Sequence, residues 1–317
     1  MSPLLLNELP PRIHRAYDLK RVNSLPFCER GAFTLKLDMV SPPPRKGPPR
    51  PVVITLHGGN WRSGSRQSLR PVLMDLAGRG FVAMSIDYRV QRSGEGKSNS
   101  IPPELLVDDL RCAIQFVKDN AFEYGLDSNR IALVGYGAGA HGVLMAGLTN
   151  PASVEGQPHP ENPIKAIVAF GAITDMTLQF NLRARQGKSL LADLLGTTPE
   201  QNPELYQQLS PVHLLDAQDP PTLVIYADKD ESVFLENGQN FDAVAKEVGA
   251  PVELLVAENT RNLNIGARHH QVQKQVYKFL ATWMDPNESI PKPPSAGTPA
   301  PTPAPTNPVV PPPAPAP

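Results

Sequence analysis

Two patterns of apolar residues alternate along the chain. One consists of short continuous apolar runs, and the other of apolar residues at helical spacing. Short apolar runs bounded by proline, glycine or charged residues predict buried strands at residues 51–57, 81–87, 131–135, 164–170, 221–227 and 251–257. Apolar residues at helical spacing predict helices at residues 68–78, 102–124, 140–148, 236–248 and 271–284. Strands that alternate with helices are typical of a mostly parallel sheet with helices on both faces. The pattern therefore predicts one α/β domain.

Both ends of the chain depart from this alternation. Residues 1–32 are polar and irregular, and we expect an N-terminal strap over the edge of the sheet, followed by a half-exposed edge strand at 32–40. Residues 285–317 are mostly proline, alanine and threonine, a composition that predicts a disordered, extended tail. The domain itself is expected at residues 33–284. The tail is either a passive spacer or a ligand for a proline-recognising domain.

The net charge and the cysteine content limit which binding partners and which cellular location we expect for the protein. The formal net charge of −1 and a pI near 6.7 argue against nucleic acid or an anionic membrane as partners. Two cysteines, Cys28 and Cys112, do not make a disulfide framework or a metal site, and Cys112 is expected as a buried thiol in a helix. We find no secretory signal and no apolar run near the ~20 residues of a membrane span, so we expect a cytoplasmic protein.

One junction between a strand and a helix lacks a linker. The strand at 131–135 runs directly into Gly135-Tyr136-Gly137-Ala138-Gly139 and then into the helix. So sharp a turn needs glycines because flanking side chains would collide with the crossing backbone. The spacing is that of a nucleophile elbow, G-x-S-x-G, with Gly137 where the serine would stand. The sequence predicts the place for a nucleophile without the nucleophile.

Other motifs, in the same order, resemble those of one enzyme family. They are HGGNW at residues 57–61, GFVAMSIDYR at 80–89, YGLDSNR at 124–130 and SPVH at 210–213. With the elbow, these motifs resemble the α/β-hydrolase superfamily, specifically small carboxylesterases with an H-G-G-x-W oxyanion loop. The resemblance covers roughly residues 30–284 and implies a helical cap at about 175–208, where the sequence predicts two or three short amphipathic helices.

The resemblance also implies an oxyanion hole. Its donors would be the backbone N–H groups of Gly58 and Gly59, on the loop after the strand at 51–57, and of Ala138, which follows the elbow residue. Asn60 and Trp61 would line the same pocket. Two further histidines near these positions, His57 and His141, are interpreted as a structural hydrogen-bonding group and a packing residue.

Besides the nucleophile, the family's catalytic triad needs an acid and a histidine base. The sequence motifs support the position of the acid better than that of the base. The segment at 227–233 resembles the family's G-x-x-D-x-x-V, which puts the acid at Asp230, with Asp228 as the alternative; either carboxylate could instead cap the following helix. The family's histidine follows the last strand after a short polar loop, and by that register Asn262 occupies its position. A local insertion would instead make His269 or His270 the base, although these are also interpreted as a surface pair.

No metal site or cofactor is expected from the motifs. There is no P-loop, no H-E-x-x-H and no Cys/His ligand spacing. Gly135-x-Gly137-x-x-Ala140 fits a loose dinucleotide fingerprint, but the acidic residue about 20 positions on, Glu155, falls in a proline-rich loop and not at the end of a strand.

Three hypotheses for the function follow. The first is a pseudoenzyme, whose carboxylesterase-like pocket binds a small ester or acyl ligand, or a partner protein, with little or no turnover. The second is an active ester hydrolase with a rebuilt triad that uses His269 or His270. The third is a scaffold that recruits partners through its proline-rich tail. The sequence indicates neither the ligand nor the oligomeric state.

Overall fold

The computed structural model describes residues 18–44, 46–90, 103–149, 162–187, 190–261 and 270–284, together with Arg15. Several predictions concern other parts of the chain. Asn262, His269, Glu155, the tail and most of the first 17 residues lie outside the described residues, and the side chain of His270 is also not described.

The described strands form one eight-stranded sheet in the order β1-β2-β4-β3-β5-β6-β7-β8. Its strands are β1 (Lys20–Arg30), β2 (Phe33–Ser41), β3 (Arg50–Leu56), β4 (Val82–Ile86), β5 (Leu126–Tyr136), β6 (Ile164–Phe170), β7 (Thr222–Ala227) and β8 (Val252–Ala257). Strands β3 to β8 are parallel, whereas β2 pairs antiparallel with both β1 and β4. The predicted mostly parallel α/β sheet is confirmed.

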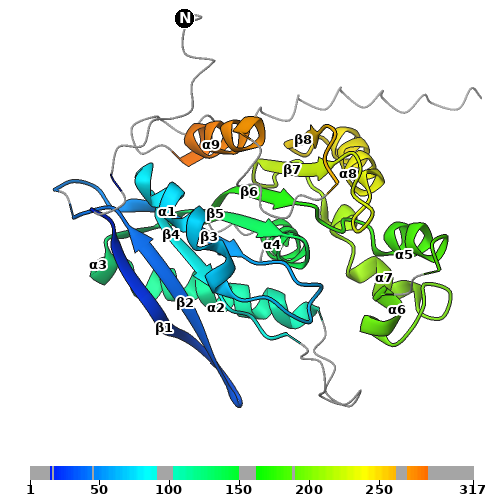
Figure 1. Cartoon of the computed structure of the whole chain (residues 1–317), viewed down its shortest axis with the longest axis horizontal. Coiled ribbons are helices and arrows are strands. Elements are labelled where there is room, and N and C mark those ends of the chain that lie inside the picture. The colour runs from blue at the N-terminus through cyan, green and yellow to red at the C-terminus, as the bar shows by residue number, and fades with distance from the viewer. Residues whose placement is uncertain are drawn as a thin grey trace, which may run out of the picture.

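Helices cover both faces of the sheet (Figure 1). Apolar residues of α1 (Arg70–Gly78) and α9 (His270–Met284) pack on one face, and those of α2 (Glu104–Asp119), α4 (Ala138–Leu148) and α8 (Leu235–Val248) pack on the other. The central strand β3 is buried at every position, because both of its faces are covered. The predicted helix at 102–124 is two helices, since α2 ends at Asp119 and a separate turn, α3 (Ala121–Tyr124), follows.

The N-terminal prediction is wrong in one respect, because the segment before residue 32 contains a strand. Strand β1 forms the edge of the sheet, and β2, predicted as the edge, is its inner neighbour. Two irregularities interrupt the pairing of β1, between Val22 and Leu25 and between Pro26 and Cys28, and Ser24 has a left-handed φ of 58°. These breaks destroy the alternation by which a strand is recognised.

The cysteine prediction is also wrong. Cys28 on β1 and Cys112 on α2 form a disulfide, with their Cα atoms 6.1 Å apart. The bond exists because α2 lies beneath β1 and brings together two residues separated by 84 positions. No helix in the described part of the chain has both the length and the apolar character needed to cross a bilayer.

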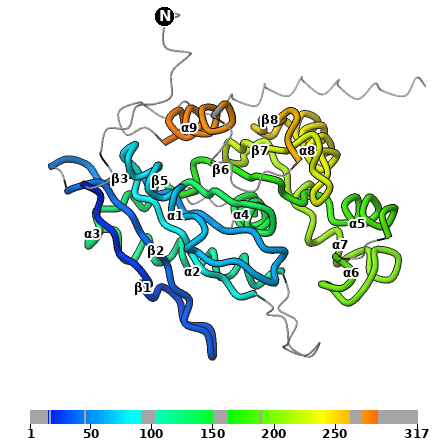
Figure 2. Tube along the Cα trace, viewed as in Figure 1, coloured from blue at the N-terminus to red at the C-terminus, as the bar shows by residue number. Residues whose placement is uncertain are grey.

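The parallel strands place the predicted site residues at one edge of the sheet. Segments that follow the carboxyl ends of β3, β5 and β7 carry the predicted oxyanion loop (residues 57–61), the elbow (residues 135–139) and the predicted acid loop (residues 227–233), respectively. Three short helices, α5 (Met176–Ala184), α6 (Leu190–Leu195) and α7 (Pro203–Gln208), gather beside this edge (Figure 2). The carboxyl edge of an open parallel sheet is where such folds bind ligands.

Candidate functional site

The turn from β5 into α4 has the backbone of a nucleophile elbow. Gly137 adopts φ 53° and ψ −113°, a conformation that is strained for any residue with a side chain. Its N–H donates to the carbonyl of Phe170 at 2.9 Å, and its own carbonyl accepts from the His141 N–H at 3.0 Å. The turn is therefore fixed to the neighbouring strand on one side and to the helix on the other.

The three elbow glycines serve different purposes. A Cβ atom on Gly135 would lie 2.3 Å from the carbonyl oxygen of Gly139, and one on Gly139 would lie 2.5 Å from that of His57, so neither position accepts a side chain. A Cβ on Gly137 would meet only the Cα of Gly58, at an ordinary 3.8 Å. The space for a nucleophilic side chain thus exists, although glycine occupies the position.

The predicted oxyanion loop lies against the elbow. Gly58 packs so closely that a Cβ there would be 3.1 Å from the carbonyl oxygen of Tyr136. Gly59 has φ 131° and lies over a turn closed by the amides of Arg62 and Ser63, each of which donates to the Gly59 carbonyl at 3.0 Å. The structure thus brings Gly58 beside Tyr136 and Gly137, directly before Ala138, whose N–H, as the first of α4, has no acceptor within the helix.

His57 fixes the start of this loop. Its ring stacks on Tyr88 with centroids 4.4 Å apart, and its Nδ1 lies 2.7 Å from the carbonyl oxygen of Gly58. The Tyr88 hydroxyl donates to the His57 carbonyl at 2.8 Å. Burial lowers the pKa of His57, against the opposing effects of the Gly58 carbonyl and Asp87. A neutral, fully engaged ring of this kind positions the loop.

His141 is equally buried. Its Nε2 lies 2.8 Å from the carbonyl oxygen of Leu209, a geometry in which Nε2 carries the proton. Burial lowers the pKa of His141 to about 4, although the Leu209 carbonyl acts in the opposite direction. The rings of His57 and His141 are both buried, and each has one nitrogen beside a backbone carbonyl of the fold, so we interpret both histidines as structural.

The two acidic candidates after β7 have different partners. Asp228 accepts from the backbone amides of Asn259 and Thr260, at 2.8 and 2.9 Å, and these bonds lower its pKa. Asp230 accepts from the amides of Ser232 and Val233, at 2.7 and 3.2 Å. Asp228 thus joins the ends of β7 and β8, whereas Asp230 shapes its own loop. Neither carboxylate caps α8. The N-cap residue of α8 is Phe234, and it makes no side-chain capping hydrogen bond.

A buried polar network joins helix α5 to this acid loop. Gln179 donates to the carbonyl of Ser232 at 2.8 Å and accepts from the side chain of Asn237, also at 2.8 Å. Arg183, one turn further along α5, donates from Nη1 to the carbonyl of Glu231 at 2.6 Å. Gln179 and Asn237 are almost inaccessible to solvent, so the bonds of these two side chains exchange poorly with water and fix α5 to the acid loop, whereas the bond from Arg183 is exposed.

A cavity of about 50 Å³ lies where the oxyanion loop, α5, α6 and the acid loop meet. It is lined by Asn60, Ile173, Gln179, Phe180, Arg183, Leu190, Leu191, Ser232 and Val233. The predicted site residue Asn60 therefore shares a pocket with the loop that carries Asp230. Two of the polar residues at this pocket, Gln179 and Arg183, were not singled out from the sequence, because a Gln and an Arg in an amphipathic helix are normally solvated.

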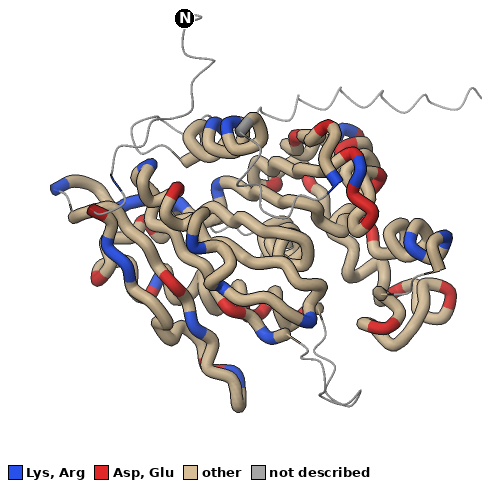
Figure 3. The backbone as a smooth tube through the Cα atoms, in the orientation of Figure 1, with Lys and Arg blue, Asp and Glu red and all other residues tan. Residues whose placement is uncertain are grey.

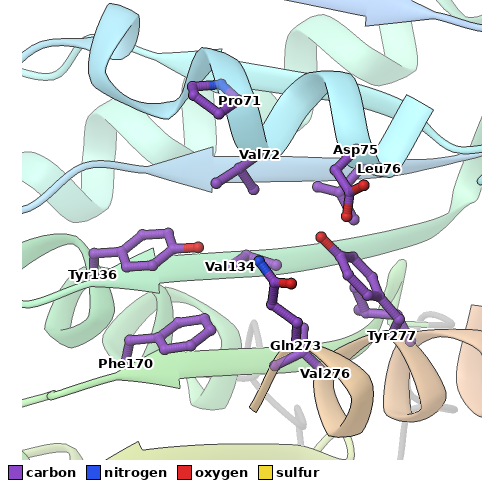
Figure 4. Close-up of a pocket in the computed structure, with 11 residues that line it drawn as sticks. Pro71, Val72, Asp75, Leu76, Val134, Tyr136, Phe170, Gln273, Val276 and Tyr277 are labelled. Atoms are coloured by element: carbon purple, nitrogen blue, oxygen red, sulfur yellow. The ribbon is translucent and has the colours of Figure 1, made fainter. Parts of the chain in front are cut away.

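Tyr136, just before the nucleophile position, faces the opposite side of the sheet. It lines a second cavity of about 40 Å³ between α1 and α9, together with Val134, Phe170 and Tyr277 (Figure 4). Its ring stacks on Phe170 with centroids 4.5 Å apart. Because the sheet separates this cavity from α4 and the oxyanion loop, we do not assign it to the site. In the described part of the chain, no group of His, Cys, Asp and Glu side chains is arranged to hold a metal.

Comparison with known proteins gives a consistent result. A sequence model of the family described as BD-FAE matches residues 37–244. Esterase LipQ of Mycobacterium tuberculosis is 26% identical over 277 residues, which are 85% of this chain and 64% of LipQ. Esterase LipC of the same organism is 30% identical over 244 residues, 73% of this chain and 58% of LipC. The chain thus spans less than two thirds of the length of either relative.

A solved structure has the same fold. The thermophilic esterase Est2 of Thermogutta terrifontis superposes with a TM-score of 0.66 at 24% identity, covering 86% of this chain and 96% of its own. This superposition identifies the fold around the eight-stranded sheet as the α/β-hydrolase fold. The matched range 37–244 contains the predicted oxyanion loop, the elbow, the three short helices and the predicted acid loop, and it ends before Asn262, the predicted base position.

Proposed function

The chain belongs to the BD-FAE family of α/β-hydrolases, and from this premise we propose that it is an esterase-like pseudoenzyme. In this proposal its pocket binds a small ester or acyl ligand with little or no turnover. The expected alternative, an active hydrolase with a rebuilt triad, is kept as an outcome of the test below.

The observation that carries the proposal is the backbone of Gly137. The residue holds φ 53° and ψ −113° at the elbow and has room for a side chain, yet it has no atom that attacks a carbonyl carbon. Triad enzymes stripped of their catalytic residues retain about 10³- to 10⁴-fold rate enhancement from the oxyanion hole and binding alone. At most a residual rate enhancement of this size is expected for this chain.

The base position supports the same conclusion. Asn262 stands where the family's register expects a histidine, and an amide side chain neither accepts a proton near neutral pH nor relays one. The two histidines that the structure describes near the elbow, His57 and His141, are buried with lowered pKa values and engaged rings. Restoring only the serine would therefore leave it without a base.

Binding is favoured because the pocket is still built at an energetic cost. Asn60 and Trp61, consecutive residues of the oxyanion loop, both hold left-handed backbone conformations, with φ 55° and 59°. Each such residue costs on the order of 1–3 kcal/mol and persists only where surrounding structure enforces it. Retention of this costly loop conformation supports a binding role for the pocket.

The test compares hydrolysis of short-chain p-nitrophenyl esters by the native chain and by the double variant Gly137→Ser, Asn262→His. We expect a nearly inactive native chain and a gain of about 10²-fold or more in the double variant. Gly137→Ser alone serves as the control, with a smaller gain. A native chain that turns over at enzymatic rates, unchanged by the double variant, would refute the proposal. Variants at His269 and His270 would then identify the base.

The disulfide changes the expected location. Disulfides persist in oxidising compartments and are rare in the cytosol. The Cys28–Cys112 bond therefore favours an extracytoplasmic place of action over the cytoplasmic one expected from the sequence.

A further inference from the structure

Among the described residues, the cavity beside the oxyanion loop combines apolar walls with one cationic side chain. Its lining residues include Ile173, Phe180 and Leu191 as apolar groups and Arg183 as the charged one. Basic and acidic positions are interspersed over the rest of the fold, without a field of one sign (Figure 3). A positive charge placed in an apolar pocket acts locally on whatever binds there, because a low-dielectric wall strengthens its field.

Arg183 is only partly used by the protein. Its Nη1 donates to the carbonyl of Glu231 at 2.6 Å and to the side-chain oxygen of Gln186 at 3.3 Å. A guanidinium has five N–H donors, and those on Nε and Nη2 of Arg183 have no partner among the described residues. No described carboxylate pairs with it either. The free edge of the guanidinium is suited to a carboxylate, which it can bind through two parallel hydrogen bonds.

The side chain is held in place before any ligand arrives. The bond to Glu231 ties it to the acid loop, and one turn earlier Gln179 bonds the next part of that loop at Ser232. The nearby acidic groups do not compete for it. Asp230 and Glu231 do not line the cavity, and Asp230 directs one carboxylate oxygen at the amides of its own loop. Preorganised donors lose little entropy on binding.

We propose that Arg183 selects a ligand that carries a carboxylate: a short acyl compound with an ester or acyl carbonyl at one end and a carboxylate at the other, as in the half-ester of a dicarboxylic acid. The carbonyl lies at the oxyanion loop beside Asn60, and the carboxylate binds Arg183. The cavity of about 50 Å³ requires a short chain between them. This inference deepens the proposed function and rests on its binding pocket.

The test uses isothermal titration calorimetry on the full chain with monomethyl glutarate and with dimethyl glutarate. The two probes differ in charge and scarcely in shape. The native chain should bind the half-ester at least about tenfold more tightly than the neutral diester, since a charge-assisted hydrogen bond separates them. Arg183→Gln should remove this preference, so that the half-ester binds no more tightly than the diester.

Arg185 provides the matched control. It lies two residues further along the chain, is exposed and does not line the cavity, so Arg185→Gln makes the same change of charge outside the site. Native-like preference for the half-ester in Arg185→Gln excludes a general effect of net charge. If Arg183→Gln lowers the affinity for both probes equally, the side chain supports the structure of the pocket and does not recognise the carboxylate. The inference is then wrong.

The remaining outcomes separate the inference from the proposed function. Equal binding of both probes by the native chain contradicts the role of Arg183 while a ligand pocket remains. Failure of both probes to bind contradicts the inference and removes the support for a binding pseudoenzyme as well. Ester hydrolysis by a native chain that still prefers the half-ester through Arg183 would overturn only the pseudoenzyme.

Discussion

The indole ring of Trp61 meets the imidazole ring of His141 edge-on, with centroids 5.3 Å apart and an interplanar angle of 77°. Both residues are buried, and among the described residues Trp61 Nε1 and His141 Nδ1 are the buried side-chain polar atoms that have no hydrogen-bond partner. The oxyanion loop is therefore joined to the elbow helix α4 by ring packing. The arrangement requires a neutral imidazole, because a second proton on Nδ1 would be buried without an acceptor.

His141 should accordingly stay neutral down to about pH 4, in the tautomer protonated at Nε2. Because the unfolded chain takes up this proton near pH 6.5, the free energy of unfolding should fall as pH decreases from 6.5 towards 4, by at most about 3 kcal/mol from this residue. Imidazole ¹⁵N chemical shifts across this range measure the tautomer and the pKa directly. The urea-unfolded chain, titrating near the ordinary value, is the reference. A His141 signal that titrates near 6.5 in the folded chain would mean that the ring is open to water.

The elbow should tolerate a side chain at Gly137 but not at Gly139. Gly137→Ala places its Cβ 3.8 Å from the nearest atom, so only the left-handed backbone opposes it, at about 1–2 kcal/mol. Gly139→Ala places its Cβ 2.5 Å from the carbonyl oxygen of His57 and should cost about 3 kcal/mol or more. Urea unfolding of both variants measures the difference. Equal losses would show that backbone strain, and not the crossing of the two segments, sets the requirement for glycine.

The core and the elbow were predictable because their physics is local. Buried parallel strands such as β3 show as continuous apolar runs, and Gly135 and Gly139 are glycines for a steric reason that their spacing reveals. Strand β1 was missed because it is mostly exposed and its register breaks near Ser24, so that its polar sequence has no regular period. Its place in the sheet depends on pairing with β2, and the sequence of β1 alone does not indicate this pairing.

The remaining features depend on contacts between distant segments. The Cys28–Cys112 bond joins positions 84 residues apart, and only the packing of α2 beneath β1 brings them together. Arg183 is one basic residue of an amphipathic helix until the carbonyl of Glu231, 48 residues away, orients it. No motif carries either relationship. The motifs predict where the site lies, and the folded chain supplies the groups around that position.

The disulfide should contribute substantially to stability. Closing a long loop restricts the unfolded chain, and such bonds typically stabilise by about 2–4 kcal/mol. The double variant Cys28→Ser, Cys112→Ser should therefore unfold at a lower temperature by several degrees. Reducing agent should lower the unfolding temperature of the native chain and leave that of the variant unchanged. If native protein melts identically with and without reductant, while free thiols are detected only in the reduced sample, the bond adds no stability.

Asp219 should destabilise the protein at neutral and alkaline pH. Burial, together with the smaller effect of the Asp216 charge, raises the pKa of Asp219 to about 7, against the hydrogen bond from the Asp216 amide at 2.7 Å. The folded chain therefore holds a proton that the unfolded chain releases near pH 3.8, so stability is lost as pH rises from 3.8 through 7. Asp219→Asn keeps the acceptor for the amide without the charge. Its gain in the free energy of unfolding should be absent near pH 4, grow up to pH 7 and remain constant above it, at about 1 kcal/mol or more after solvent screening. A gain that is the same at pH 4 and pH 8 would show that packing, and not ionisation, accounts for the effect.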